Sequence, residues 1–260
     1  MTPLRRILAV AVAMGIGLMP PVARAEDAAL VAAAADLKFA VQEIADAFTA
    51  ETGKDVKLAF GSTGNFARQI REGAPFELFM AADEAFILDL AKDGFLRDEG
   101  TLYAEGRIVI MVPHGSALKA DAALDDLAAG LADERVKKFA IANPEHAPYG
   151  MRAEEALRHR GLWDKVQPAL VMGENVAQAA QFATSGNAQG GIVAYSLALS
   201  PEVSKLGSFA LIPAEWHSPL LQRMALTKNA RAGAEAFYAY MQSPKAREIM
   251  ERYGFVLPGE

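Results

Sequence analysis

The chain has 260 residues, of which 32 are acidic and 26 are basic, and its formal net charge is −6 at neutral pH. A surface of this sign disfavours nucleic acid and anionic lipid as partners. The absence of cysteine excludes disulfides, thiolate metal ligands, a thiol nucleophile and a lipid attached through a cysteine.

The first 25 residues have the pattern of a secretory signal peptide. Arg5 and Arg6 precede an apolar run from Ile7 to Met19, which is too short to remain in a bilayer as a spanning anchor. Small residues follow, so we predict cleavage after Ala25 and a periplasmic mature protein. Cleavage would remove three of the 26 basic residues and no acidic one, which leaves 235 residues with a net charge of −9. Local dipoles must then hold any bound anion against the overall charge.

Short apolar segments alternate with amphipathic segments along the rest of the chain. This alternation is typical of an α/β fold with mostly parallel sheets, in which ligands bind beyond the carboxyl ends of strands, near helix N-termini. We predict strands at 29–35, 55–60, 76–80, 107–112, 138–143, 169–173, 190–195, 209–213 and 222–227. We predict helices at 37–52, 66–71, 84–92, 151–160, 176–184, 231–242 and 244–252.

The junction Gly61-Ser62-Thr63-Gly64-Asn65 has the composition of an anion-binding loop. The glycines allow the backbone to approach a ligand closely, the two hydroxyls can donate protons, and the following helix adds unpaired N–H groups. No lysine follows the glycines, so this is not the phosphate loop of nucleotide-binding proteins. The alternative is an ordinary helix cap, in which Ser62, Thr63 or Asn65 accepts from the first turn.

Asp36 stands just before the first predicted helix, where aspartate is a favoured N-cap. As a ligand, its ionised carboxylate would repel a dianion but could accept a proton from a protonated oxyanion. Tyr149, at the end of the stretch "NPEHAPYG", offers a hydroxyl either to a ligand or to a backbone carbonyl. Val176 opens another helix and could bind an anion through its backbone N–H, with Glu174 and Asn175 expected as caps.

Signals for catalysis are weak, and we expect that the protein is not an enzyme. Ser62 lacks the G-x-S-x-G context of a nucleophile. The four histidines are scattered without metal spacing, so structural or surface roles are expected for them; they are His114, His146, His159 and His217.

Five stretches together resemble one family, and the resemblance covers nearly all of residues 29–258. They are "AAADLKFAVQEIADAFTAETG", "FGSTGNFARQIREGAPFELFMAADE", "ANPEHAPYG", "GENVAQAAQFATSG" and "FYAYMQSPKAREIMERYGFVLP". In order and spacing they are similar to the periplasmic molybdate-binding proteins of ABC transporters.

The resemblance implies a type II periplasmic binding protein, with two lobes that are joined by two crossing segments. Lobe 1 would hold residues 26–107 and 221–260, and lobe 2 residues 108–220. Molybdate or tungstate would bind in the cleft through neutral hydrogen-bond donors, with the metal held as its oxyanion and without a cofactor or direct metal ligand. The protein would be a monomer whose closed form meets a membrane permease with its ATPase.

By the same resemblance, the oxyanion-binding residues are Ala35 and Asp36, Ser62 or Thr63, and the backbone groups around Tyr149 and Val176. The departure is Asp36, where typical members have Ser, Thr or Asn. Either its carboxylate turns away to cap its own helix, which we favour, or the ligand is another tetrahedral oxyanion, such as hydrogen phosphate, arsenate or sulfate. Further alternatives are a ferric or organic-acid receptor that uses Tyr149 and Asp36 as oxygen ligands, and the sensor domain of a regulator.

Overall fold

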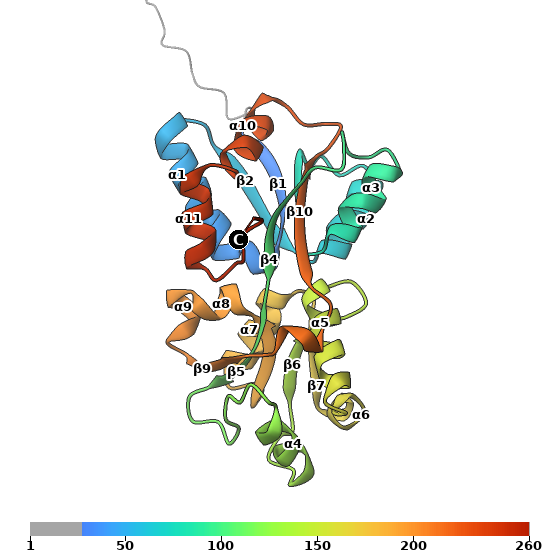
Figure 1. Cartoon of the computed structure of the whole chain (residues 1–260), viewed down its shortest axis with the longest axis vertical. Helices are drawn as coiled ribbons and strands as arrows, with labels where there is room; N and C mark the ends of the chain where they lie inside the picture. Colours follow the sequence, from blue (N-terminus) through green and yellow to red (C-terminus); the bar gives the residue numbers. More distant parts are fainter. Residues whose placement is uncertain (1–27, 260) are drawn as a thin grey trace, which may run out of the picture.

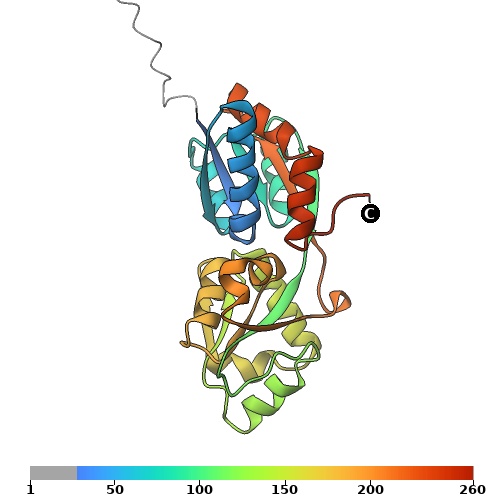
Figure 2. The same cartoon turned by 90° about the vertical axis from the view of Figure 1, so that its left-hand side faces the viewer.

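A computed structural model describes residues 28–259, so the predicted signal peptide lies outside the described residues. Two five-stranded sheets, each with its own helices, form two stacked bodies that are joined by two connections (Figure 1). The side view shows both connections on the same side of the molecule (Figure 2). We call the body around the sheet β2-β1-β3-β10-β4 lobe 1 and the body around the sheet β7-β6-β8-β5-β9 lobe 2. Within residues 28–259, no helix is long and apolar enough to cross a membrane.

Lobe 1 is built from both ends of the described chain. Its strands are β1 (Ala29–Ala34), β2 (Val56–Gly61), β3 (Leu78–Ala81), β4 (Thr101–Gly106) and β10 (Leu220–Leu226). Its helices are the 3₁₀ turn η2 (Ala35–Leu37), α1 (Lys38–Thr52), α2 (Thr63–Arg71), α3 (Glu84–Lys92), α10 (Ala232–Tyr240) and α11 (Pro244–Arg252).

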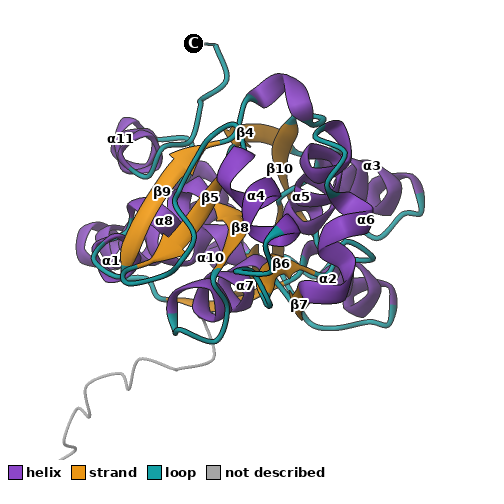
Figure 3. Cartoon of the chain, turned by 90° about the horizontal axis from the view of Figure 1, so that it is seen from below, coloured by secondary structure: helices purple, strands orange, loops and turns teal. Residues whose placement is uncertain are grey.

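Lobe 2 is a continuous stretch between the two connections, and helices cover both faces of its sheet (Figure 3). Its strands are β5 (Ile108–Pro113), β6 (Phe139–Ala142), β7 (Leu170–Gly173), β8 (Gly190–Ala194) and β9 (Gly207–Leu211). Its helices are α4 (Asp125–Ala132), α5 (Pro148–His159), α6 (Trp163–Val166), the 3₁₀ turn η3 (Gln167–Ala169), α7 (Val176–Thr184), α8 (Tyr195–Leu199) and α9 (Pro201–Ser204). The 3₁₀ turn η4 (Ala214–Trp216) lies in the return connection.

Strand direction follows from these two crossings. In lobe 1, β1, β2, β3 and β4 run the same way and β10 is antiparallel to its neighbours. In lobe 2, β6, β7, β8 and β9 run the same way and β5 is antiparallel to its neighbours. The reversed strand is in each case the first after a crossing, because it starts at the boundary where the other four end. The predicted α/β fold with mostly parallel strands is confirmed, and each sheet is mixed through one strand.

Local chemistry explains the elements that surround the cleft. The small side chains of β1 allow close packing on both faces of the sheet, and all but one of its residues are buried. Helix α1 buries Val41, Ile44 and Phe48 at helical spacing and ends where Gly53 adopts the left-handed φ of 68°. Phe48 meets Phe237 of α10 edge-to-face, with ring centroids 5.3 Å apart, which joins the two ends of the described chain in one core.

The sequence-based boundaries of two helices were wrong in a way that matters for function. Helix α2 begins at Thr63 instead of 66, and α5 begins at Pro148 instead of 151. Proline is favoured in a first helical turn because its missing N–H has no intrahelical acceptor there. Both shifts place predicted site residues in first turns. The helices α4, α6, α8 and α9 and the strand β4 were not predicted.

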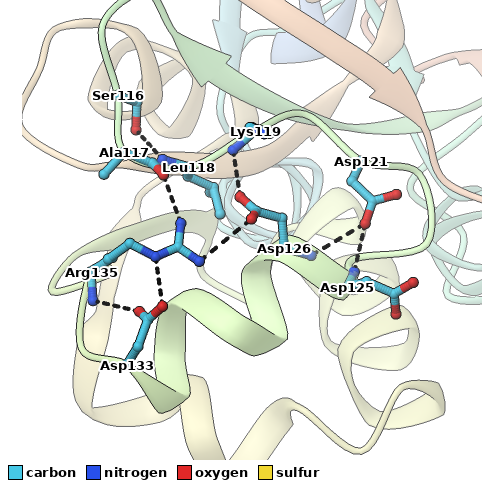
Figure 4. Close-up of polar contacts among 9 residues, drawn as sticks. All are labelled: Ser116, Ala117, Leu118, Lys119, Asp121, Asp125, Asp126, Asp133 and Arg135. Atoms are coloured by element: carbon cyan, nitrogen blue, oxygen red, sulfur yellow. Dashed lines mark hydrogen bonds and ion pairs between the residues drawn. The ribbon is translucent and has the colours of Figure 1, made fainter.

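Charged side chains order the end of lobe 2 that is far from lobe 1 (Figure 4). Asp121 accepts from the backbone N–H of Asp125 at 2.7 Å and so caps the start of α4. Arg135 donates to the Ala117 carbonyl and to Asp133, both at 2.7 Å. The long connection between β5 and β6 belongs to neither sheet, and these side-chain bonds hold it in place.

Glu77 is a buried charge that joins three segments of lobe 1. Its carboxylate accepts from the backbone N–H groups of Leu30 and Arg231, at 3.0 Å each, and from the Arg231 guanidinium at 2.8 Å. Hydrogen bonds from Arg231 hold the pKa of Glu77 below its usual value of 4.5. A depressed pKa stabilises the fold above the unfolded value, and this contribution is lost as the pH falls through the folded pKa.

We expect Glu77→Gln to lower the free energy of unfolding at pH 7 by about 1–3 kcal/mol, because it removes charge-assisted bonds from a buried site. Urea unfolding monitored by circular dichroism measures this. The difference from wild type should shrink below pH 4.5. Glu72→Gln is the control: its exposed carboxylate lies 3.9 Å from Arg68, and its loss should change stability by less than about 1 kcal/mol. Equal effects of the two substitutions would contradict the role given to Glu77.

Candidate functional site

Five strand-to-helix junctions line one small cavity between the lobes. Its free space, counted with the solvent at its mouth, is about 190 Å³, so the cavity has room only for a small ligand. The structure thus brings all six predicted site residues to one place, three segments of lobe 1 facing two of lobe 2. The lining residues are Ala34, Ala35, Asp36, Gly61, Ser62, Thr63 and Ala82 from lobe 1, and Ala147, Pro148, Tyr149, Asn175 and Val176 from lobe 2.

Helix N-termini supply most of the polar lining. Thr63 and Val176 are the first residues of α2 and α7, and Tyr149 is the second residue of α5. N–H groups in a first turn have no intrahelical acceptor and lie at the positive end of the helix dipole. Tyr149 carries the first N–H of α5, because the preceding Pro148 has none. The cavity is therefore a place where backbone donors from both lobes converge.

At the start of α7, the predicted cap is half right. The Asn175 side chain accepts from the N–H groups of Ala177 and Gln178, both at 3.1 Å, which confirms it as the N-cap. The Glu174 carboxylate does not cap; it lies 3.6 Å from the imidazole Nε2 of His146. The Asn175 side chain accepts only from the second and third N–H groups of α7. The first N–H group, that of Val176, is not bonded to this cap.

The Ser62 and Thr63 hydroxyls are held differently. Ser62 occupies the N-cap position of α2 but makes no capping bond, so the alternative of a side-chain cap is wrong for it. Its hydroxyl donates to the His146 carbonyl at 2.6 Å and lies 2.8 Å from Nδ1 of the same residue. The Gly64 N–H donates to that carbonyl too, at 2.9 Å. The Thr63 hydroxyl accepts from the Ala82 N–H at 3.1 Å, which leaves its own proton for donation.

Asp36 is almost fully buried, and its predicted capping role is wrong. The N-cap of η2 is Ala34, and the Asp36 side chain makes no capping bond. Oδ2 instead accepts from Gln222 Nε2 at 2.7 Å and from the Tyr149 hydroxyl at 3.1 Å. The backbone carbonyl of Asp36 accepts from Ser196 at 2.8 Å. Oδ1 is buried and has no hydrogen-bond partner.

Burial dominates the electrostatics of this carboxyl group. It raises the pKa of Asp36 to about 6, against the opposing hydrogen bonds from Gln222 and Tyr149. Burial and the Asp36 charge raise the pKa of Tyr149 and of Tyr103 well above their usual value, so both phenols stay protonated donors. Tyr103 donates to Gln222 Oε1 at 2.9 Å, and Gln222 Nε2 also lies 3.1 Å from the Tyr149 oxygen.

Sequence reasoning missed this buried network. Gln222 is the only uncharged polar side chain of β10, and it is fully buried next to a register shift between β10 and β4. A polar residue at a fully buried strand position is the one signal that could have found it. Tyr103 lies on the strand that was not predicted. His146, expected in a structural or surface role, sits at the contact between the lobes.

Two further features of the boundary depend on tight packing. A Cβ on Gly106 would lie 2.3 Å from the Tyr149 hydroxyl oxygen, so only glycine leaves room for the network. Beside the cavity, Arg152 of α5 pairs with Asp83 of lobe 1 at 2.7 Å.

Between residues 28 and 259, no three His, Asp or Glu side chains are grouped as a metal site.

Comparison with known proteins shows which family this chain resembles. Residues 29–256 match the family model described as bacterial extracellular solute-binding protein. The chain is 36% identical to the molybdate-binding protein ModA of Rhodobacter capsulatus over 95% of each chain, and 36% identical to that of Azotobacter vinelandii over 95% of this chain and 96% of the other. The solved periplasmic molybdate-binding protein of Azotobacter vinelandii superposes with a TM-score of 0.79 and 32% identity, covering 88% of this chain and 99% of that one.

These matches confirm the resemblance that the sequence motifs indicated. They also confirm the expectation of a binding protein in place of an enzyme, since the family is one of solute-binding proteins. Because the family model spans nearly all of the described residues and relatives above 30% identity match over nearly their full length, this chain belongs to the bacterial extracellular solute-binding proteins, as a ModA-like member.

Proposed function

We propose that this protein is the periplasmic binding component of an ABC importer and that it binds molybdate or tungstate in the cavity between the lobes. The observation that carries the proposal is the convergence of uncharged donors from four strand ends on one small cavity, in a chain similar to ModA proteins. Residues of both lobes line the cavity, so a bound ion contacts both only when they are together. A permease with its ATPase would take the ion from this closed form.

The donors would be the backbone N–H groups at Ala35, Asp36, Thr63, Tyr149 and Val176, with the Thr63 hydroxyl. The Ser62 hydroxyl would join them by turning its proton from the His146 carbonyl to the ion. Neither Lys nor Arg is among the residues that line the cavity. Hydrogen bonds to an anion are short and roughly twice as strong as neutral ones, and they strengthen further where water is excluded. Neutral donors can therefore hold a dianion without a compensating cation, as helix N-termini do for phosphate and sulfate.

Size would select the cargo. Donors that belong to separate packed elements keep fixed separations, and an ion with longer metal–oxygen bonds reaches all of them at once. Sulfate is smaller and would leave some donors unpaired, at a cost of about 1–3 kcal/mol for each. The ligand would also stabilise the closed arrangement, because it makes its full set of contacts only there.

A second candidate function is reception of a protonated tetrahedral oxyanion, such as hydrogen phosphate or hydrogen arsenate. The observation that favours it is the unpartnered Oδ1 of Asp36, a hydrogen-bond acceptor in a cavity otherwise lined by donors. A ligand that carries an O–H group would satisfy that oxygen directly.

A thermal-shift panel with molybdate, tungstate, sulfate, phosphate, arsenate and chromate should distinguish the cargoes. Molybdate and tungstate should raise the melting temperature most at equal concentration, since a ligand of the native state adds about 4 kcal/mol at a thousand times its Kd. A larger shift with phosphate or arsenate would favour the second candidate. An unchanged melting temperature with all six ions would refute both.

The double variant Ser62→Ala, Thr63→Ala should bind molybdate at least tenfold more weakly, because a charge-assisted hydrogen bond contributes ~1.5–3 kcal/mol. Isothermal titration calorimetry on the mature protein measures this. Thr184→Ala is the matched control: it removes a hydroxyl that bonds the Ala180 carbonyl within α7, away from the cavity. Unchanged affinity in the double variant would show that neither hydroxyl binds the ion.

A further inference from the structure

Asp36 lines the cavity, and one oxygen of its carboxyl group is buried without a hydrogen-bond partner. Its exposed fraction is 1%, and two donors already occupy Oδ2, while Oδ1 has none. Asp36 lines the cavity together with Ser62 and Thr63, so an oxyanion held by those residues lies beside this carboxyl group. A buried acceptor without a donor is costly, and a ligand in the cavity that Asp36 lines would be able to supply the missing partner.

The charges around Asp36 make an ionised carboxylate and a bound dianion incompatible. The titratable groups that face it are Tyr149 from α5 and Tyr103 from β4, both neutral phenols. The other neighbours are the amide of Gln222 from β10 and the hydroxyl of Ser196 from α8. No cation among the described residues hydrogen-bonds to this carboxylate. Two like charges at hydrogen-bond distance in a buried site strongly disfavour the state in which both are ionised.

We propose that Asp36 takes up one proton from solvent as the oxyanion binds, and that this proton lies between Oδ1 and an oxygen of the anion. The inference rests on the proposed function only in that an oxyanion must occupy the cavity. The carboxylate becomes a carboxylic acid and no other bond changes. Oδ2 stays the acceptor for Gln222 and Tyr149, which leaves Oδ1 as the oxygen that carries the proton. Asp36 thus acts as one more neutral donor, in a position where an asparagine amide would serve the same role.

The sign of the pH dependence follows from the free protein. Burial raises the pKa of Asp36 to about 6, so the carboxyl group is mostly ionised above that pH and must gain a proton when the anion binds. Linkage then requires the Kd for the anion to rise with pH above about 6, approaching tenfold per pH unit, and to level off below it. Molybdate is a suitable probe because it is a dianion over this range and its own titration does not contribute.

The test is isothermal titration calorimetry of molybdate into the mature protein at pH 7.5, in two buffers with different ionisation enthalpies. We expect wild type to take up about one proton per bound anion. Asp36→Asn should bind molybdate with no proton uptake and with a Kd that does not change between pH 6.5 and 8.5. Asp83→Asn is the control at the same boundary: it loses the pair with Arg152 but should keep the uptake of wild type.

Molybdate binding by wild type without proton uptake would overturn the inference and leave the proposed function intact. Uptake that persists in Asp36→Asn would overturn it as well, because it would place the proton on another group. Should Asp36→Asn fail to fold, the difference infrared spectrum of wild type with and without molybdate decides: a new protonated carboxyl band supports the inference, and its absence contradicts it. A protein that binds none of the six oxyanions of the thermal-shift panel would overturn the inference and the proposed function together.

Discussion

The geometry of the site depends on the direction of the strands. In each sheet, four strands end at the boundary between the lobes, and only the strand that enters from the other lobe starts there. Four of these ending strands pass the chain to a turn or helix whose first N–H groups lie at the cavity. The turn η2 follows β1, α2 follows β2, α5 follows β6 and α7 follows β7. A binding site made of backbone donors is thus a consequence of the topology, and side chains only refine it.

Exclusion of water strengthens the hydrogen bonds that these donors make, and it also destabilises a buried ionised group. Hydrogen bonds from amides and hydroxyls gain strength in a low dielectric, because water does not compete for them. An ionised carboxylate in that environment is destabilised, and the pKa of Asp36 rises for this reason. The network of Tyr103, Gln222 and Tyr149 holds the carboxyl group in place with neutral partners and supplies no cation. The cavity is thus lined by uncharged groups, and the Asp36 carboxyl group is the one that we propose to take up a proton.

Hydrogen bonds that cross the boundary couple the cavity to the approach of the lobes. The carbonyl of His146 in lobe 2 accepts from Ser62 and Gly64 of lobe 1, and the Tyr149 hydroxyl of lobe 2 donates to Asp36 of lobe 1. The ion pair between Arg152 and Asp83 lies beside them and is largely shielded from solvent. Several of these contacts involve residues that line the cavity. Occupancy of the cavity and contact between the lobes therefore depend on the same atoms, which is the physical basis for a ligand that favours the closed arrangement.

The amino-acid sequence alone determined the local features of this protein. The alternation of apolar strands and amphipathic helices, the glycines and hydroxyls at 61–65 and the helix start at Val176 depend on neighbours within a few residues, so they were legible without a structure. The junctions that hold the six predicted cavity residues were within reach because parallel strands end at one edge, and the resemblance to molybdate-binding proteins selected the residues within them. The polar strand β4 was missed, because its partners, β10 and Val256, are distant in the sequence and it lacks a strong apolar pattern.

The tertiary structure alone decided how these residues are used. The Asp36 carboxylate turns to Gln222, 186 positions away, and not to its own helix, because a register shift in β10 and the packing of α5 bring those partners to it. His146 reaches Ser62 across 84 positions for the same kind of reason. Contacts between distant segments depend on how whole sheets pack. Patterns within a few residues of the sequence do not show which distant segments meet.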